Sequence, residues 1–270
     1  LDLPLYKELN AKSNFMIPFK DITLADKDTI TSFTMKSDRR NCDLSFSNLC
    51  SWRFLYDTQF AVVDNFLVFK FWAGEQLAYM MPVGTGDLKA VLWELIEDAR
   101  KENQHFCMLG VCSNMRTDLE AILPEQFTFT EDRDYADYIY LSTLKGKKFQ
   151  AKRNHINRFR NTYPDYEYTP ITPDRIQECL DLEAEWCKVN NCDQQEGTGN
   201  ERRALIYALH NFEALGLTGG ILHVNGKIVA FTFGMPINHE TFGVHVEKAD
   251  TSIEGAYAMI NYKFANRIPE

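Results

Sequence analysis

The 270-residue sequence lacks the segments that place a protein in or across a membrane. No run approaches the roughly 20 apolar residues that span a bilayer. The first residues, LDLPLYKELNAK, do not show the basic and then apolar pattern of a signal peptide. These absences predict a soluble, cytoplasmic protein. A peripheral association with a membrane surface stays open.

The sequence also lacks any CxxC pair, although it has seven cysteines. Their odd number in a chain of this size favours reduced thiols over a disulfide framework. Cys187 and Cys192 precede His210, and Cys107 and Cys112 follow His105. Because this spacing matches no common zinc site, we expect buried structural thiols and no metal.

The glycine spacing of a P-loop or a dinucleotide-binding fingerprint is absent as well. The composition is that of a globular protein, with 45% apolar and 13% aromatic residues. Since domains usually hold about 100 to 200 residues, the length favours two of them. We expect an extension of uncertain origin at 1–15, a first unit at 16–144, a basic linker helix at 145–164 and a second unit at 165–270.

Positive charge is concentrated in residues 145–161, which read KGKKFQAKRNHINRFRN. This stretch holds seven Lys or Arg and no acid, whereas the whole chain has a formal charge of -9 and the rest of it therefore -16. Four apolar side chains fall within about 80° of one another on a helical wheel, namely Phe149, Ile156, Phe159 and Tyr163. The stretch is thus predicted to be an amphipathic helix with a docking face.

The cations of this predicted helix have three potential partners. These are a phosphate-rich ligand such as the acceptor arm of tRNA, an anionic membrane surface, and the acidic remainder of the protein itself. The candidate phosphate- or tRNA-binding residues are Lys147, Lys148, Lys152, Arg153, His155 and Arg158.

The two halves of the chain predict the same order of elements. Each half has a short strand, two helices, three antiparallel strands, a glycine-containing loop and a further helix. Hairpin turns are expected at Asp64-Asn65 and at Asn225-Gly226, and helical spacing predicts a helix within 88–104. Additional strands are expected at 106–112 and within 127–141. The shared order indicates two copies of one α/β (α+β) fold with mixed sheets.

Each half delivers a strand into a glycine-containing loop and then a helix, at residues 82–87 and 251–256. Backbone N–H groups at a helix start point outward, and small residues let an anion approach them. The loops are therefore candidate anion sites. The alternative is a plain strand-to-helix turn that uses glycine for its backbone freedom.

With the basic segment KRNHINRF and the ending EKADTSIEGAYAMINYKF, the chain resembles the C-terminal domain of bacterial phosphatidylglycerol lysyltransferases over roughly residues 17–270. The related Fem-type aminoacyltransferases share this architecture of two GNAT-like acyltransferase units in tandem. The resemblance implies transfer of an acyl or aminoacyl group from coenzyme A or aminoacyl-tRNA to an amine or hydroxyl acceptor, including an anionic lipid. The implied contacts to acyl-CoA are Val246, Lys248, Thr251, Ser252, Gly255 and Ala256.

The chain departs from the GNAT pattern in two ways. Ser252 stands where the pyrophosphate signature has Arg or Gln, and Tyr257 replaces its final small residue. The chain also stops just after the last predicted helix, where the fold adds further strands, so we expect a second unit that is truncated or closed in another way. The first unit is expected to be a degenerate copy that supports the second.

The last predicted strand, TFGVHVEKAD, carries the candidate catalytic residues. Regular alternation places His245 and Glu247 on one face. Ionisable groups in a covered strand are costly unless they line a cleft, so we expect Glu247, or else His245, to be a general base. Tyr257 is the candidate acid for the leaving group. The alternative is a strand with one solvated polar face.

A helix expected near residues 173–190 carries Glu183, Glu185 and Trp186. These side chains could recognise a cationic acceptor, or they could form the exposed stripe of an amphipathic helix. The sequence as a whole favours an enzyme of the acyltransferase class. The alternative is a non-catalytic module that binds tRNA or anionic lipid.

Overall fold

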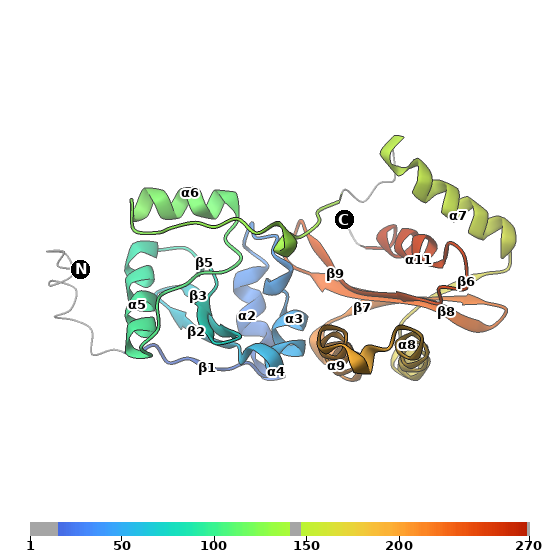
Figure 1. Cartoon of the computed structure of the whole chain (residues 1–270), viewed down its shortest axis with the longest axis horizontal. Helices are drawn as coiled ribbons and strands as arrows, with labels where there is room; N and C mark the ends of the chain where they lie inside the picture. The colour runs from blue at the N-terminus through green and yellow to red at the C-terminus, as the bar shows by residue number, and fades with distance from the viewer. Residues whose placement is uncertain (1–15, 141–146, 269–270) are drawn as a thin grey trace, which may run out of the picture. The chain divides into compact units, whose positions relative to one another are not determined.

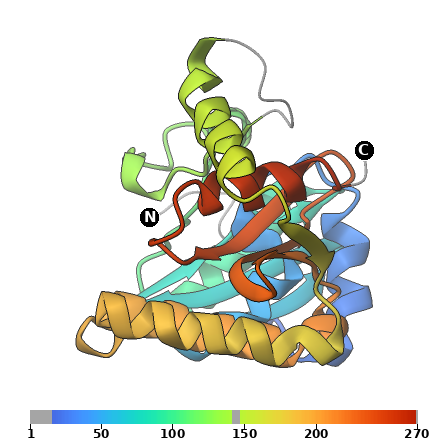
Figure 2. The same ribbon diagram turned by 90° about the vertical axis from the view of Figure 1, so that its right-hand side faces the viewer.

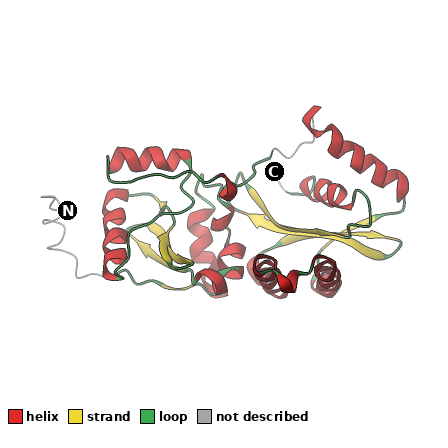
Figure 3. Cartoon of the chain, viewed as in Figure 1, coloured by secondary structure: helices red, strands yellow, loops and turns green. Residues whose placement is uncertain are grey.

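The computed structural model describes residues 16–140 and 147–268 (Figure 1). It confirms the mixed α/β class, with two separate sheets whose paired strands are antiparallel (Figure 3). Contacts divide the described chain into two compact units, one with residues up to Ile22 and Leu55–Tyr135, the other with Thr23–Phe54 and the residues from Ala136 onward. The predicted units, 16–144 and 165–270, are instead continuous stretches of sequence, and these boundaries stay a prediction.

The sheet of the first unit has the strand order β1-β2-β3-β4, and a short strand, β5, also pairs with β3. The predicted hairpin at Asp64-Asn65 is confirmed, because both residues have positive φ and join β2 to β3. The strands are β1 Lys20–Asp21, β2 Gln59–Val63, β3 Phe66–Ala73, β4 Gln76–Tyr79 and β5 Val83–Gly84.

Helix α5 (Leu88–Lys101) is confirmed and packs its apolar face on this sheet. Val91 and Leu95 lie in one core cluster with Val68 and Leu77. The side chain of Asp87 caps the helix by accepting a hydrogen bond from the N–H of Ala90. Helix α6 (Ser113–Ile122) contributes to a second apolar cluster with α5.

The strands predicted after α5 are largely wrong. Within 106–112 only Met108 pairs, through one parallel bridge to Tyr79. Within 127–140 there is no strand, and the side chains of Tyr135, Tyr138 and Tyr140 are exposed. Aromatic residues favour strands only where the sheet buries them, and the acids before and between these tyrosines oppose burial. Residue 141, the end of this prediction, lies outside the described residues.

The sheet of the second unit has the strand order β6-β7-β8-β9. The turn at Asn225-Gly226 is confirmed, with φ of 52° and 74°. The strands are β6 Glu167–Pro170, β7 Thr218–Val224, β8 Lys227–Pro236 and β9 Phe242–Ala249.

The helices of the second unit cover both faces of its sheet (Figure 2). The predicted basic helix is confirmed as α7 (Gln150–Thr162), which packs with α11 (Ala256–Ala265) on one face. Ile156 and Phe159 of α7 lie in one core cluster with Met259 and Ile260 of α11. The apolar docking face predicted for the basic helix is therefore confirmed. The other helices of this unit are α2 Lys27–Thr34, α3 Phe46–Ser51, α8 Ile176–Asn190, α9 Glu196–His210 and α10 Phe212–Leu215.

Helices α8, α9 and α10 cover the opposite face of that sheet (Figure 1). Strand β9 thus runs between two helical layers of its own unit, α11 on one side and α8 on the other. The short helix α4 (Arg53–Tyr56) falls at the division between the two units.

Candidate active site around strand β9

Strand β9 contains a β-bulge at the position of the predicted site. Phe233 pairs with Val246 and Gly234 pairs with Val244, so His245 is an extra residue with no partner on β8. A bulge of this kind bends the strand and redirects its side chains.

The bulge separates the two candidate bases. Glu247 pairs with Thr232, whereas Gly243 pairs with Met235, three residues further along β8, so Glu247 and Gly243 lie on opposite faces. The ring of His245 lies beside Gly243, its Cε1 3.1 Å from where a Cβ would stand. The expectation that His245 and Glu247 point together is therefore wrong, because it assumed regular alternation.

Glu247 is part of a hydrogen-bonded chain that reaches the basic helix. The amide nitrogen Nδ2 of Asn261 donates to Glu247 Oε2 at 2.9 Å, and Lys152 Nζ donates to Asn261 Oδ1 at 2.5 Å. Burial raises the pKa of Glu247, and the Asn261 hydrogen bond and the Lys152 charge only partly offset it. A carboxylate with a raised pKa is a stronger base than an ordinary surface carboxylate.

His245 lies on the other face of β9 and is half-buried. Burial lowers its pKa from 6.5 to about 4. Its Nε2 is buried and has no hydrogen-bond partner among the described residues. The imidazole is therefore neutral at physiological pH.

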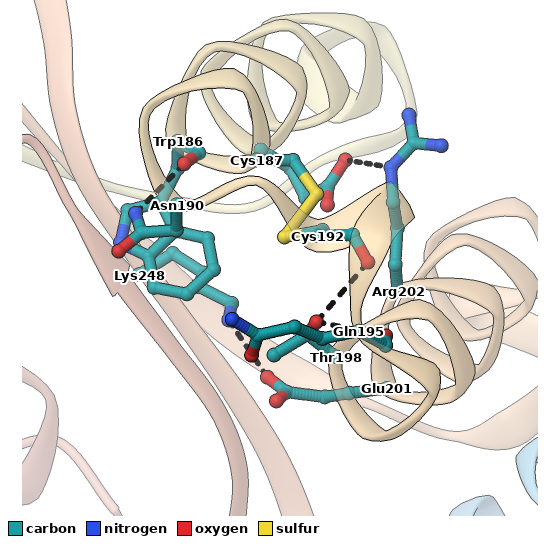
Figure 4. The surroundings of a disulfide bond; sticks show 10 residues. Trp186, Cys187, Asn190, Cys192, Gln195, Thr198, Glu201, Arg202 and Lys248 are labelled. Atoms are coloured by element: carbon teal, nitrogen blue, oxygen red, sulfur yellow. Dashed lines mark hydrogen bonds and ion pairs between the residues drawn. A yellow bond between two sulfur atoms is a disulfide. The ribbon is translucent and has the colours of Figure 1, made fainter.

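Tyr257, the candidate acid, belongs to a cluster that also contains Trp186 of α8. Trp186 Nε1 donates to the Tyr257 hydroxyl at 3.1 Å. Lys248 Nζ lies 3.6 Å from the centre of the Trp186 ring and donates to Glu201 Oε1 at 2.7 Å (Figure 4). Because the indole donates to the phenol oxygen, the phenol proton is left for another acceptor. The ammonium of Lys248, which is buried, is already engaged inside the protein.

The two acids singled out on α8 differ. Glu185 forms an exposed pair with Lys188, as expected for a surface stripe. Glu183 is 2% exposed and accepts a hydrogen bond from Arg202 Nε at 3.2 Å, so the surface alternative is wrong for it. Burial raises the pKa of Glu183, and the charges of Arg202 and then Lys248 oppose this effect.

Cys187 and Cys192 form a disulfide, which corrects the expectation that the thiols are reduced (Figure 4). The bond joins the last turn of α8 to the turn before α9. Asn191 supplies the left-handed conformation that lets the chain reverse within five residues. The other cysteines form no disulfide, and the expected burial holds for Cys50 and Cys179 but not for Cys112, which is exposed.

The second glycine loop packs against the basic helix. Gly255 has φ of +84°, and a Cβ there would lie 2.7 Å from the carbonyl oxygen of His155. Glu254 pairs with Arg158, and the Ser252 side chain donates to Asp250 at 2.6 Å. These contacts favour the turn interpretation of the loop, since its glycine serves a close helix approach. Within the same predicted cofactor set, Thr251 is exposed and Ala256 is buried.

Glycine serves a similar purpose in the first loop. A Cβ at Gly84 would collide with the backbone of Asn65, and one at Gly86 would crowd Asp64 and Phe66. This loop therefore lies directly against the β2–β3 hairpin.

The predicted phosphate-binding cations divide into two groups. Lys152 and Arg158 are engaged with α11 and the loop before it, which favours the intramolecular explanation for part of the positive charge. Lys147, Lys148 and His155 are exposed. Arg153 donates a hydrogen bond to the side chain of Gln150, one turn earlier on the same helix.

Sequence reasoning missed the partners that reach these residues from other elements. They are Asn261 beside Glu247, Glu201 beside Lys248 and Arg202 beside Glu183. The sequence offers one weak signal for them: each is a polar residue within a helix that is expected to pack on a sheet. In the described ranges, no three His, Cys, Asp or Glu side chains gather as metal ligands.

Comparison with protein families identifies the chain. The family described as phosphatidylglycerol lysyltransferase, C-terminal, matches residues 34–270. The chain belongs to this family. The resemblance inferred from the basic segment and the C-terminal motif is thereby confirmed. No curated protein matches the chain.

Solved structures include a conserved protein of unknown function from Bacteroides thetaiotaomicron that is 91% identical, with a TM-score of 0.92 over 94% of this chain and 87% of that one. The C-terminal domain of a protein named as a lysylphosphatidylglycerol synthetase from Agrobacterium fabrum is 13% identical, with a TM-score of 0.61 over 90% and 74%. L-PGS from Bacillus licheniformis is 15% identical, with a TM-score of 0.57 over 92% and 74%. At these low identities, the last two likenesses show the fold alone.

Across 16–140 and 147–268, no helix combines the length and the apolar character that crossing a membrane requires.

Proposed function

We propose that this chain transfers an aminoacyl group from aminoacyl-tRNA to a hydroxyl or amine of a membrane lipid, as a cytoplasmic domain peripheral to the bilayer. The observation that carries the proposal is the chain of hydrogen bonds from Lys152 through Asn261 to Glu247. It joins a half-buried carboxyl with a raised pKa to the basic helix. Membership of the lysyltransferase family supports this donor and acceptor.

We further propose that the two halves are GNAT-like units in tandem. Both sheets keep their first four strands in sequence order, and in both halves a helix follows the glycine-containing loop. The first half also has the parallel bridge from Tyr79 to Met108 beyond its fourth strand.

In the proposed reaction, Glu247 removes a proton from the acceptor as its oxygen or nitrogen attacks the ester carbonyl carbon. A bond forms between the acceptor and that carbon, and the ester bond to the terminal ribose breaks. Tyr257, whose oxygen accepts the Trp186 hydrogen bond, gives its proton to the ribose oxygen. Solvent then returns the proton from Glu247 to the tyrosinate.

The test is a transfer assay with tRNA carrying a radiolabelled amino acid and vesicles that contain phosphatidylglycerol. We expect label in the lipid extract with the unmodified protein, rising with pH as Glu247 ionises. Loss of a general base typically costs about 100-fold or more, so Glu247→Gln should lose at least that. The matched control is Glu185→Gln, an exposed acid on α8. Full activity of Glu247→Gln would remove Glu247 from the base role.

Coenzyme A remains a proposed alternative donor at the loop before α11. A calorimetric titration of the protein with coenzyme A tests it. Binding that Gly255→Glu abolishes would support the second unit as its site, and absence of binding would leave aminoacyl-tRNA as the donor.

A second candidate function is a non-catalytic module for tRNA or anionic lipid. The separation of His245 from Glu247 by the bulge favours it, because it leaves each candidate base without the other. RNA or lipid binding without any transfer, in the presence of charged tRNA and vesicles, would support this candidate.

A further inference from the structure

Three cations of the second unit lie against three tyrosines at the C-terminal ends of α7 and α11. Arg160 Cζ is 5.1 Å from the centre of the Tyr262 ring. Lys263 Nζ is 5.0 Å from the Tyr166 ring, and Arg267 Cζ is 4.3 Å from the Tyr168 ring. We call these six residues the tyrosine–cation surface.

The six residues form one continuous surface. Tyr166 is hydrogen-bonded by both Arg160 and Lys263, and Arg160 also reaches Tyr262. Lys263 lies in the last turn of α11, and Arg267 follows directly after its C-cap, Asn266. Tyr166 and Tyr168, two residues apart, lie on the same side of the chain entering β6.

The three cations have no carboxylate partner within the part of the chain that the structure describes. Among the ion pairs of the described residues, none includes Arg160, Lys263 or Arg267. This lack of counter-charge stands out in a chain of net charge -9. Three like charges on one small surface repel one another unless an anion joins them.

The electrostatics of Tyr166 report the same local excess of positive charge. Burial alone raises the pKa of this phenol, yet the hydrogen bonds and charges of Lys263 and Arg160 outweigh burial and bring its pKa below the ordinary value. In contrast, the cations Lys152 and Arg158, near the middle of α7, are satisfied by side chains of the protein.

We propose that the tyrosine–cation surface binds the phosphodiester backbone of single-stranded RNA. The inference rests on the proposed function, in which the donor is an RNA, and gives that RNA a place on the second unit. Cations beside aromatic rings are a usual feature of sites that hold single-stranded nucleic acid. Here the rings are half-buried and a cation lies over each of them, so the cations are the groups offered to the phosphates.

The exposure of the rings favours RNA over a bilayer. Aromatic residues that anchor a protein in a membrane interface present exposed apolar surface. Tyr166, Tyr168 and Tyr262 are half-buried, and none is among the exposed large apolar side chains of the described residues.

The test measures binding of a fluorescein-labelled single-stranded RNA oligonucleotide, and of uncharged tRNA, by anisotropy at several salt concentrations. The variant combines Arg160→Gln, Lys263→Gln and Arg267→Gln. The matched control combines Lys36→Gln, Lys89→Gln and Lys227→Gln, which removes the same charge from exposed positions elsewhere.

We expect the triple variant at the surface to bind RNA at least about tenfold more weakly at low salt. Its slope of log affinity against log salt should fall by roughly 2, because each lost phosphate contact on a single strand contributes about 0.7. The control should stay near the unmodified protein. Arg267→Gln alone changes only an exposed side chain and should give a smaller loss in the same direction, which keeps the test valid if the triple variant fails to fold.

Unchanged RNA affinity in both the triple and the single variant would overturn the inference. Reduced sedimentation with phosphatidylglycerol vesicles while RNA binding is unchanged would overturn it in favour of a lipid site. The readout needs no catalysis, so RNA binding lost at this surface would support the inference even if no transfer activity is found. If transfer activity depends on Glu247 but not on these cations, the inferred RNA site is wrong while the proposed function still holds.

Discussion

The two halves of the chain use a similar arrangement of strands and helices with different polar chemistry. In the first half, the buried Tyr79 hydroxyl donates to Asp98 at 2.6 Å, and Lys70 lies 3.2 Å from the same carboxylate. In the second half, Glu247 meets only a neutral amide among its hydrogen bonds, and His245 Nε2 meets no partner among the described residues.

This difference separates residues that stabilise the fold from candidates for chemistry, although the first half also has a carboxyl, Glu94, whose pKa is raised by burial and whose Oε2 has no partner among the described residues. Paired polar groups such as Tyr79 and Asp98 add to stability. Half-buried ionisable groups with shifted pKa values, such as Glu247 and His245, oppose it and are typical of functional sites. The candidate chemistry therefore rests on Glu247 of the second half, and a supporting role for the first half stays a prediction.

The pH dependence of His245 gives the largest expected effect on stability. Its pKa falls from 6.5 to about 4 on folding, so the unfolded chain binds the proton more tightly. Stability should decrease as pH falls between these values, by about 3 kcal/mol in total. Urea denaturation across this range should show that His245→Asn lacks this loss. The same acid dependence in the variant would contradict the burial of the ring.

Alanine at the loop glycines compares the two halves directly. Gly255→Ala should cost about 2–3 kcal/mol, because its φ is positive and His155 of α7 is in the way. It should also loosen α7. Gly84→Ala should be similarly costly but leave α7 in place.

The control for these substitutions is Gly74→Ala, which has positive φ with open space around it. It should cost only about 1 kcal/mol. Thermal unfolding together with proteolysis near residues 147–162 measures both effects. Equal costs at Gly74 and Gly255 would show that α7 does not depend on this contact.

The disulfide should give a smaller effect, confined to the second half. Closing so short a loop stabilises by about 2 kcal/mol in the chain-entropy description. A reductant should lower the free energy of unfolding by that amount in the unmodified protein. The double variant Cys187→Ser, Cys192→Ser should start lower and not respond. A response of the double variant would implicate other cysteines.

The sequence predicts the elements whose signals are local. Turn residues such as Asn225-Gly226 and the spacing of apolar residues in α5 and α7 identify hairpins and helices, because backbone preference and burial agree there. The segment 127–140 misleads, since its tyrosines have strand preference but no sheet to join.

The candidate site is less predictable, because its geometry depends on contacts between distant residues. The bulge at His245 places every following side chain on the face opposite to the one that regular alternation predicts. The residues VHVEK contain no signal for a bulge. Asn261 meets Glu247 only once α11 packs on β9. The disulfide depends on Asn191 adopting a left-handed turn.

The central claim is that the second half keeps Glu247 at a cost to stability because its chemistry requires it. The most direct measurement is the free energy of unfolding of the unmodified protein and of Glu247→Gln from mildly acid to neutral pH. Since folding raises the pKa of this carboxyl, the folded state binds its proton more tightly, and the contribution of Glu247 to stability should fall as pH rises above the ordinary glutamate value, opposite in sign to the contribution of His245. We predict that Glu247→Gln loses this decline and is at least as stable as the unmodified protein at neutral pH, while transfer activity falls. A variant that is less stable at neutral pH, with unchanged pH dependence, would show that Glu247 is a structural residue and contradict the account.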